Sequence, residues 1–249
     1  MSNSPKSKSI KTTVAICIVA VILFGGFLFW MWYENDGKYN DDPIFANIFS
    51  WSGSKNFDEL RLKYPDIVAW VEVPNTNVNM AVVQHPTDDY YYLSHGPNGE
   101  QDMFGAAYIE LCNKDDFSDP VTVIYGHNMM DDSMFATLHY FEDLQFFKDN
   151  MYFYIYTPGH KYTYTIVSAF AYDNRHIINT NKGFQNKDVL KQYYEVVQNP
   201  TTHLKNVRSD VKLTENDKIV QLSTCMSDIN LSNQRYIVTG VLTEDQETD

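Results

Sequence analysis

The first long apolar stretch of the chain is uncharged from Thr12 to Tyr33, a run of 22 residues. At about 1.5 Å per helical residue the run is about 33 Å long, which is enough to cross a hydrocarbon core of about 30 Å. Trp30, Trp32 and Tyr33 lie at its far end, where an interfacial aromatic belt is expected. The pattern predicts a transmembrane helix over residues 12–33.

The next 22 residues, 34–55, are polar and irregular and predict a linker. Residues 56–64 then have the composition of a short helix, with Asn56 as its cap and Pro65 as its stop.

Beyond this helix the pattern is mainly that of β-strands. Eight segments are rich in Val, Ile, Tyr, Phe and Thr, and turn residues such as Pro74-Asn75 and Pro158-Gly159 separate several of them. The predicted strands are Ile67–Val73, Asn77–Gln84, Met103–Leu111, Val121–Tyr125, Met151–Thr157, Tyr162–Tyr172, Lys218–Thr224 and Tyr236–Thr243.

Two segments have helical rather than β spacing. Ser133–Phe147 places Met134, Leu138 and Phe141 on one stripe, and Asn186–Gln198 has apolar residues on one side and ends before Pro200. Eight short strands with few helices predict a mainly β fold, closed or nearly closed into a barrel.

Charge gives the apolar run an orientation. Lys6, Lys8 and Lys11 are the only charged residues before Glu34, and acidic residues follow the run. The positive-inside rule predicts a cytoplasmic tail at residues 1–11 and an extracellular remainder. A cleaved signal peptide is the alternative, but the run exceeds the usual apolar core of about 7–15 residues and no Ala-x-Ala-like site follows it.

The net charge of −13 argues against one class of partner. A strongly acidic domain is repelled by phosphate backbones, so we expect no nucleic-acid binding.

Three cysteines differ in their surroundings. Cys17 lies in the apolar run as a small apolar residue, and Cys112 and Cys225 lie in the extracellular part. A disulfide between Cys112 and Cys225 is one interpretation for an oxidising compartment. The local sequence around Cys225 favours a free thiol instead.

Three β-like segments carry reactive groups at their ends. His127 follows an apolar strand through Gly126, Cys225 ends Ile219–Cys225, and Arg235 opens the next strand ten positions later. A Cys nucleophile requires ionisation, a His can protonate a leaving amine, and an Arg can donate to a developing oxyanion. Together they indicate acyl transfer through a thioester.

Each of the three residues also has a plain structural interpretation. Cys225 can be a small buried apolar residue, His127 a solvated loop residue and Arg235 the partner of a surface carboxylate. A zinc site lacks support, since no Cys-x-x-Cys or His-x-x-x-His spacing occurs, and we predict no metal. Six other histidines do not follow an apolar strand directly through a Gly: His85, His95, His139, His160, His176 and His203.

At these residues the chain resembles the sortases, most closely those of class B. Leu222-Ser223-Thr224-Cys225 resembles the T/L-x-T-C signature, and Tyr125-Gly126-His127-Asn128 resembles the G-H motif. Arg235 matches the third catalytic position, and the order of the three residues matches too. The early helix and the late helix Asn186–Gln198 point to class B, over roughly residues 56–243.

The resemblance implies a closed eight-stranded β-barrel with an N-terminal helix and one late inserted helix, in a catalytic domain at 56–249. It implies that Cys225 attacks a Thr carbonyl in the C-terminal sorting signal of a secreted protein, that His127 protonates the departing amine, and that Arg235 holds the carbonyl oxygen or the substrate backbone. A peptidoglycan precursor amine then resolves the thioester.

Two further residues are candidates for helping at the oxyanion and substrate: the Met226 N–H and the Ser223 hydroxyl. For Ser223, a bond within the strand ladder is the alternative. No carboxylate can be assigned to orient His127, because Asp131, Asp132 and Asp228 have the character of loop acids. Cofactors are not expected.

Two other functions stay open. The same three residues can polymerise pili by using a protein Lys as the acceptor. A non-catalytic, membrane-tethered β-barrel that binds a partner is the second alternative.

Overall fold

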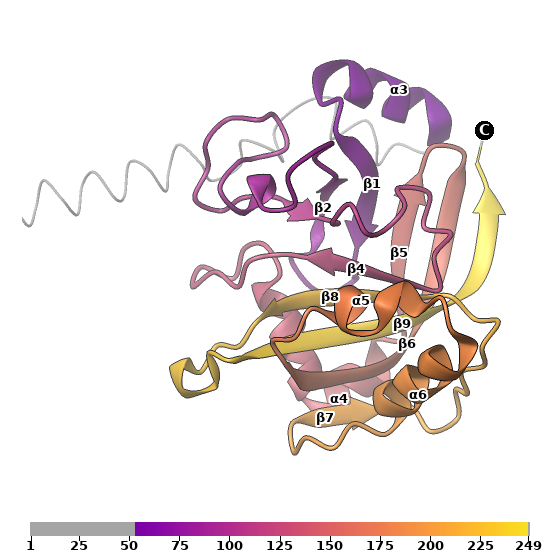
Figure 1. Cartoon of the computed structure of the whole chain (residues 1–249). Coiled ribbons are helices and arrows are strands. Elements are labelled where there is room, and N and C mark those ends of the chain that lie inside the picture. Colours follow the sequence, from indigo (N-terminus) through magenta and orange to yellow (C-terminus); the bar gives the residue numbers. More distant parts are fainter. Residues whose placement is uncertain (1–52, 249) are drawn as a thin grey trace, which may run out of the picture. The chain divides into compact units, whose positions relative to one another are not determined.

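The computed structural model describes residues 53–248 (Figure 1). The predicted cytoplasmic tail, the predicted membrane helix and nearly all of the predicted linker lie outside these residues. The chain divides into two units, Met1–Trp51 and Ser52–Asp249, and the second contains every element described below. No helix between residues 53 and 248 has both the length and the apolar character to cross a bilayer.

Nine strands and several short helices make up this second unit. The strands are β1 (Ile67–Glu72), β2 (Asn79–Val83), β3 (Ala107–Tyr108), β4 (Val121–Tyr125), β5 (Tyr152–Thr157), β6 (His160–Asp173), β7 (Lys205–Val207), β8 (Ile219–Cys225) and β9 (Gln234–Glu247). The helices are α3 (Gly53–Lys63), η1 (Tyr91–Leu93), η2 (Ala136–Glu142), α4 (Leu144–Asp149), α5 (Ile177–Thr180), η3 (Lys182–Phe184), α6 (Lys187–Gln198) and η4 (Ile229–Leu231).

Eight of the strands close into a barrel, as predicted. Their order is β5-β1-β2-β3-β4-β8-β9-β6, and pairing between β5 and β6 closes the ring, while β7 adds to β6 outside it. Closure satisfies the edges that an open sheet would leave unpaired. β4 and β8 run parallel, and β8 and β9 run antiparallel.

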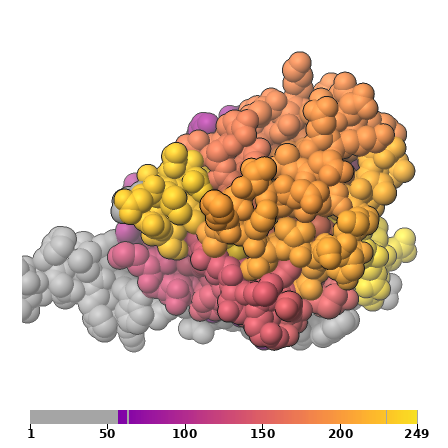
Figure 2. Space-filling view, turned by 90° about the horizontal axis from the view of Figure 1, so that it is seen from below, coloured from indigo at the N-terminus to yellow at the C-terminus, as the bar shows by residue number. Residues whose placement is uncertain are grey.

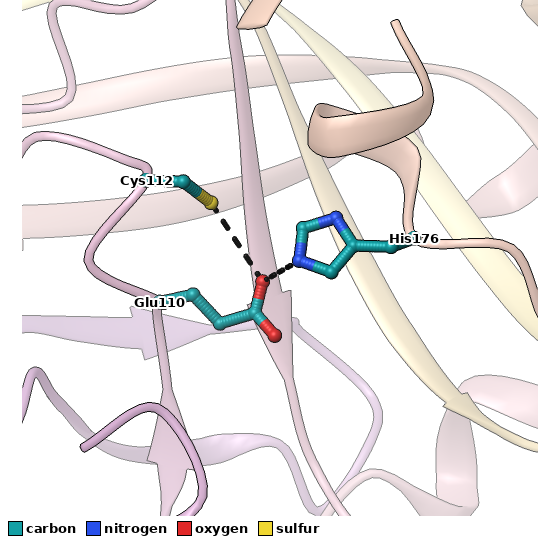
Figure 3. Close-up of side chains that lie close together, drawn as sticks. All are labelled: Glu110, Cys112 and His176. Atoms are coloured by element: carbon teal, nitrogen blue, oxygen red, sulfur yellow. Dashed lines mark hydrogen bonds and ion pairs between the residues drawn. The ribbon is translucent and has the colours of Figure 1, made fainter. Parts of the chain in front are cut away.

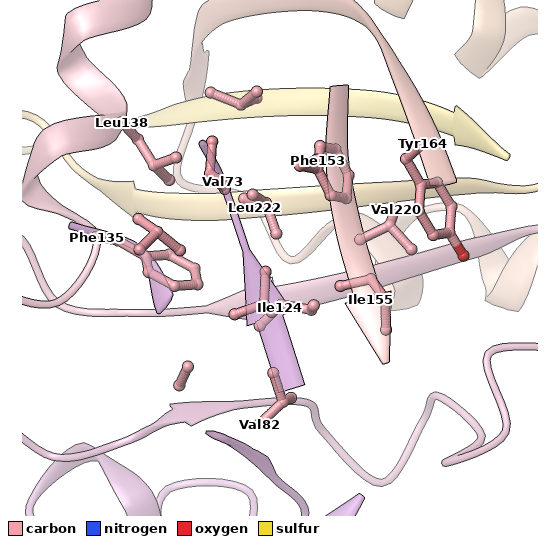
Figure 4. Close-up of a cluster of buried hydrophobic side chains, with 14 of the residues drawn as sticks. Val73, Val82, Ile124, Phe135, Leu138, Phe153, Ile155, Tyr164, Val220 and Leu222 are labelled. Atoms are coloured by element: carbon pink, nitrogen blue, oxygen red, sulfur yellow. The ribbon is translucent and has the colours of Figure 1, made fainter. Parts of the chain in front are cut away.

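Alternation along β8 gives it two different buried faces. Val220 and Leu222 point into the barrel, where they join Ile124, Phe153 and Tyr164 (Figure 4). Ile219 points outward and joins a second apolar cluster under α5 and α6. Because both faces are covered, β8 is buried at every position except Cys225.

The segment between β6 and β8 supplies this outer cover. In Figure 2 its orange and gold residues form much of the visible face. Within it, α6 begins where the Asn186 side chain accepts a hydrogen bond from the Asp188 N–H at 2.8 Å. The buried residues of α6 recur at helical spacing: Leu190, Tyr193, Tyr194 and Val197.

Most predicted elements are found, with three corrections. The predicted helix Ser133–Phe147 is wrong as one helix, because the 3-10 turn η2 and the short helix α4 are separated at Asp143, whose side chain caps α4. The predicted strand Met103–Leu111 shrinks to two paired residues, since Gly105 has a φ of 61° and turns the chain just before it. The early helix begins at Gly53, before the predicted cap Asn56.

Candidate active site

Cys225 and Arg235 face each other across two neighbouring strands. They are partners in the antiparallel β8–β9 ladder, so their side chains leave the same face of the sheet. The Arg235 Nη1 donates a hydrogen bond to the Cys225 Sγ at 2.6 Å. Both residues are half-buried, which leaves the thiol supported by the scaffold but within reach of solvent.

His127 is brought to the same end of the barrel by β4. Tyr125, the last residue of β4, is level with Ser223 in the parallel β4–β8 ladder, and His127 and Cys225 each follow two residues later. Two hydrogen bonds extend the pairing beyond the strand: Gly126 N–H donates to the Ser223 carbonyl at 3.1 Å, and the Thr224 hydroxyl donates to the Gly126 carbonyl at 2.9 Å. His127 therefore follows the end of β4 that lies beside the end of β8, where Cys225 contacts Arg235.

A backbone carbonyl, rather than a carboxylate, orients the His127 ring. Its Nε2 lies 2.8 Å from the Leu93 carbonyl oxygen, which can only accept, so Nε2 carries the hydrogen. In the neutral ring, Nδ1 is then the nitrogen with the lone pair. Leu93 ends η1, a segment 34 residues earlier in the chain with no sequence signal for this role.

The three acids near the key residues are loop acids, as expected. Asp131 accepts hydrogen bonds from the main chain and hydroxyl of Ser133, and Asp228 accepts from Asn230. The main-chain carbonyl of Asp132 accepts from the Asn77 side chain.

Ser223 and Met226 flank the thiol on either side in sequence. Ser223 is buried, and as the residue two before Cys225 in β8 its side chain leaves the same face as the thiol. Its main-chain carbonyl belongs to the ladder. Met226 follows the last residue of β8, and its partly buried side chain packs against the cluster inside the barrel.

Two residues not selected from the sequence hold the main chain of Cys225. The Asn128 Nδ2 donates to the Cys225 carbonyl at 3.0 Å, and the His139 Nε2 lies 2.9 Å from the same oxygen. Asn128 directly follows the G-H pair, which is the only sequence signal for it. His139 is 86 residues from Cys225 and lies on a 3-10 turn.

The other thiol, Cys112, belongs to a separate polar cluster. Glu110 accepts from the Cys112 Sγ at 3.7 Å and contacts the His176 Nε2 at 2.6 Å (Figure 3). Burial and the nearby carboxylates of Glu110 and Asp89 raise the pKa of the Cys112 thiol to about 12. Cys112 and Cys225 are both free thiols, so the disulfide interpretation does not apply.

Protonation of His176 determines what this cluster can bind. Its Nδ1 accepts the Asn179 N–H as the cap of α5, so in the neutral ring the hydrogen is on Nε2, facing Glu110. A metal at Nε2 would need the lone pair there, and metal-bound histidines normally donate from the other nitrogen. Although Glu110, Cys112 and His176 lie within reach of one ion, their hydrogen bonds are those of a closed polar network.

Comparison with known proteins gives one consistent result. A family model described as a sortase domain matches residues 71–243. Sortase B of Listeria monocytogenes is 26% identical over 242 residues, covering 92% of this chain and 95% of that protein. The structure of Clostridium perfringens sortase B superposes with a TM-score of 0.67 at 29% identity, covering 76% of this chain and all of that one. A Staphylococcus aureus sortase B–substrate complex gives a TM-score of 0.69 at 23% identity, covering 81% and 92%.

Proposed function

This chain belongs to the sortase family of cysteine transpeptidases, and we propose that it cleaves the C-terminal sorting signal of secreted proteins and transfers them to an amine of peptidoglycan or its precursor. Its similarity to sortase B proteins, one of them in complex with a substrate, supports a peptide as the first substrate. We assign Cys225 as the nucleophile, His127 as the proton donor to the leaving amine and Arg235 as the oxyanion donor.

The hydrogen bond from Arg235 to the Cys225 sulfur carries this proposal. A guanidinium that reaches the sulfur at 2.6 Å also lies next to the carbonyl carbon that this sulfur would attack. Its fixed set of N–H donors suits the charge that develops on the carbonyl oxygen. His127, which follows the end of β4, lies near the same end of these strands.

The reaction balances with these three side chains. The Cys225 thiol gives its proton to His127 Nδ1, the resulting thiolate attacks the scissile carbonyl carbon, and the carbonyl π electron pair moves onto the oxygen beside Arg235. When the tetrahedral intermediate collapses, the C–N bond breaks and the amine leaves with the proton carried on His127 Nδ1. An incoming amine then attacks the thioester, returns a proton to His127 and releases the thiolate.

Membrane attachment is part of the proposal and rests on the sequence. The apolar run 12–33, with lysines before it and acids after it, supports a single-pass protein with a cytoplasmic N-terminus. Protease added outside intact cells should then remove the catalytic domain and leave a short protected N-terminal fragment. Full protection of the chain would contradict this orientation.

The test of the activity uses the full chain, purified in detergent and incubated with a panel of sorting-signal peptides. We expect a mass increase on the peptide that contains Cys225, equal to the N-terminal part of the substrate. Cys225→Ala should abolish both cleavage and adduct while the thermal unfolding curve stays cooperative. Retained cleavage in this variant would refute the nucleophile assignment.

The acceptor is tested by the mass of the final product. Addition of a wall-precursor amine should give a conjugate that carries the precursor fragment. A conjugate joined instead through a Lys of a second protein would assign the chain to pilus polymerisation. Failure of Cys225 to form any adduct would favour a binding module.

A further inference from the structure

The Cys225 carbonyl oxygen lies within hydrogen-bond distance of two side-chain nitrogens. Asn128 Nδ2 donates to it at 3.0 Å and also donates to the Ser227 Oγ at 3.0 Å. His139 Nε2 approaches the same oxygen at 2.9 Å. Asn128 lies in the turn after β4 and His139 lies on η2, so two separate segments of the chain hold the peptide after the thiol.

The two nearest partners of the His139 ring nitrogens are acceptors. Nδ1 lies 2.5 Å from the Glu142 carboxylate, and Nε2 faces the Cys225 carbonyl. A carbonyl and an ionised carboxylate can only accept, so both ring nitrogens carry hydrogen in this arrangement. The Asn128 Nδ2, a donor, lies farther away, at 3.3 Å from His139 Nε2, and both nitrogens are closer to the Cys225 carbonyl oxygen.

The surroundings of His139 also hold its ring in one position. The ring stacks on Tyr236 of β9 with 4.8 Å between centroids, and its side chain is 13% exposed. Glu142 belongs to the same 3-10 turn, Asn128 follows β4, and the Tyr236 hydroxyl is the titratable group from β9. Glu142 is thus the one carboxylate that the structure gives as a partner of this ring.

Peptide geometry carries the effect to the next residue. A trans peptide is planar, with its C=O and N–H pointing in opposite directions. The Ser223 carbonyl accepts from Gly126 after β4, and two residues later the Cys225 carbonyl accepts from Asn128 of the same turn. The Met226 N–H therefore points the other way, toward β9 and Arg235. A hydrogen bond to the carbonyl also polarises the amide and strengthens its N–H as a donor.

We propose that His139, charged through Glu142, is a positioning residue that orients and polarises the Cys225–Met226 peptide so that the Met226 N–H serves as an oxyanion donor opposite Arg235. The inference rests on the proposed function, because it concerns the same acylation step. It assigns a role to a histidine that touches neither the substrate nor the thiol.

The first test measures the kinetics of adduct formation in four variants of the full chain. The substrate is a sorting-signal peptide that the wild type cleaves, and kcat and KM are obtained for each variant. We expect His139→Ala to lower kcat about 10- to 100-fold with little change in KM, because a small misplacement of a donor is costly in the transition state. His139→Gln, which keeps one N–H for the carbonyl, should recover part of the loss. Glu142→Gln should lower kcat less than His139→Ala.

The fourth variant is a matched control. His160 is also paired with a carboxylate, at 2.7 Å from Asp245, but lies twelve residues along β6 from the residue that pairs with Arg235. His160→Ala should leave kcat unchanged. Alkylation of Cys225 by iodoacetamide, which needs no oxyanion donor, should proceed at similar rates in wild type and His139→Ala.

Nitrogen chemical shifts measured by NMR distinguish this role from a purely structural one. In wild type at neutral pH both His139 ring nitrogens should show the shifts of protonated nitrogens, and the Met226 amide should shift in His139→Ala. An unprotonated Nε2, or a kcat unchanged in His139→Ala, would overturn the proposal. Because wild type must form the adduct in the same assay, failure of the proposed function would be seen separately as no adduct in any variant.

Discussion

The planar guanidinium of Arg235 is the residue-scale feature most directly tied to the chemistry. We predict that Arg235→Lys lowers kcat/KM by about 10- to 100-fold, because a Lys ammonium cannot reproduce the fork that reaches both the sulfur and a neighbouring oxygen. The measurement is kcat/KM for the sorting-signal peptide that the wild type cleaves fastest. Arg175→Lys is the control, since Arg175 is an exposed residue paired with Asp173. Equal activity of both variants would make Arg235 structural.

A second residue-scale prediction concerns two buried tyrosine hydroxyls. The Tyr236 hydroxyl is buried without a hydrogen-bond partner among residues 53–248, whereas the Tyr193 hydroxyl donates to Gln221 at 2.7 Å. An unpaired buried polar group costs about 1–3 kcal/mol. Tyr236→Phe should therefore raise the free energy of unfolding by about 1 kcal/mol, and Tyr193→Phe should lower it. Urea unfolding of both variants measures the difference, and destabilisation by Tyr236→Phe would indicate a missing partner.

At the scale of elements, the turn after β4 fixes the position of His127. A Cβ on Gly126 would lie 2.5 Å from the Phe135 ring, so only glycine lets the turn pass this core residue. Gly126→Ala should destabilise the fold and lower kcat of the folded fraction, because the added carbon shifts the residue next to His127. Gly240→Ala is the matched control: its Cβ would lie 2.4 Å from Phe153, inside the barrel. It should cost stability but leave kcat unchanged, and similar kcat losses in both variants would contradict the prediction.

The strands that carry the chemistry were predictable from sequence because they are regular. β4 and β8 are runs of mostly buried residues and lie within a residue of the predicted bounds, and β9 is buried from Tyr236 to Val241 but begins two residues before the predicted start. The placement of His127, Cys225 and Arg235 near one end of these strands depends on the order β4-β8-β9, which local sequence does not contain. The resemblance to sortases implied only that the three residues share one site in a closed barrel.

The contacts around these three residues could not be predicted from the sequence, and each contact was missed for its own physical reason. Leu93 contributes a main-chain carbonyl, which every residue has, so no side-chain pattern marks it. His139 lies on a segment predicted as regular helix, whereas η2 has a tighter 3-10 spacing that changes which residues face Cys225. β7 has only three residues and was missed because so short a strand has no period.

At the scale of the whole molecule, one polar network joins the barrel to the segment that covers it. His176 caps α5 at the start of the covering segment, and its contact with Glu110 ties that segment to the chain after β3. Burial of Tyr125, the last residue of β4, raises its pKa, and the Glu110 carboxylate adds to the effect. The network therefore reaches from the covering segment to the strand that precedes His127.

This network makes stability depend on pH through Glu110. Burial raises the pKa of Glu110, with the charge of His176 acting in the opposite direction. A raised pKa means that the folded state holds its proton more tightly than the unfolded chain, whose carboxyl titrates near about 4.3. The stabilisation that comes from the raised pKa of Glu110 is therefore fully present below the pKa of the unfolded chain. It is lost as the pH rises through the pKa of the folded state.

Glu110→Gln removes this titration while keeping a side chain that can accept from His176. We therefore expect the unfolding free energy of wild type, relative to Glu110→Gln, to fall as the pH is raised from about 4 toward neutrality. Urea unfolding at several pH values measures it, with Glu59→Gln, an exposed carboxylate on α3, as the control that should show no such trend. A relative stability that rises with pH would mean that the attraction between Glu110 and a protonated His176 outweighs the cost of burying the carboxylate, and that the covering segment is held by an ion pair rather than by a shared proton.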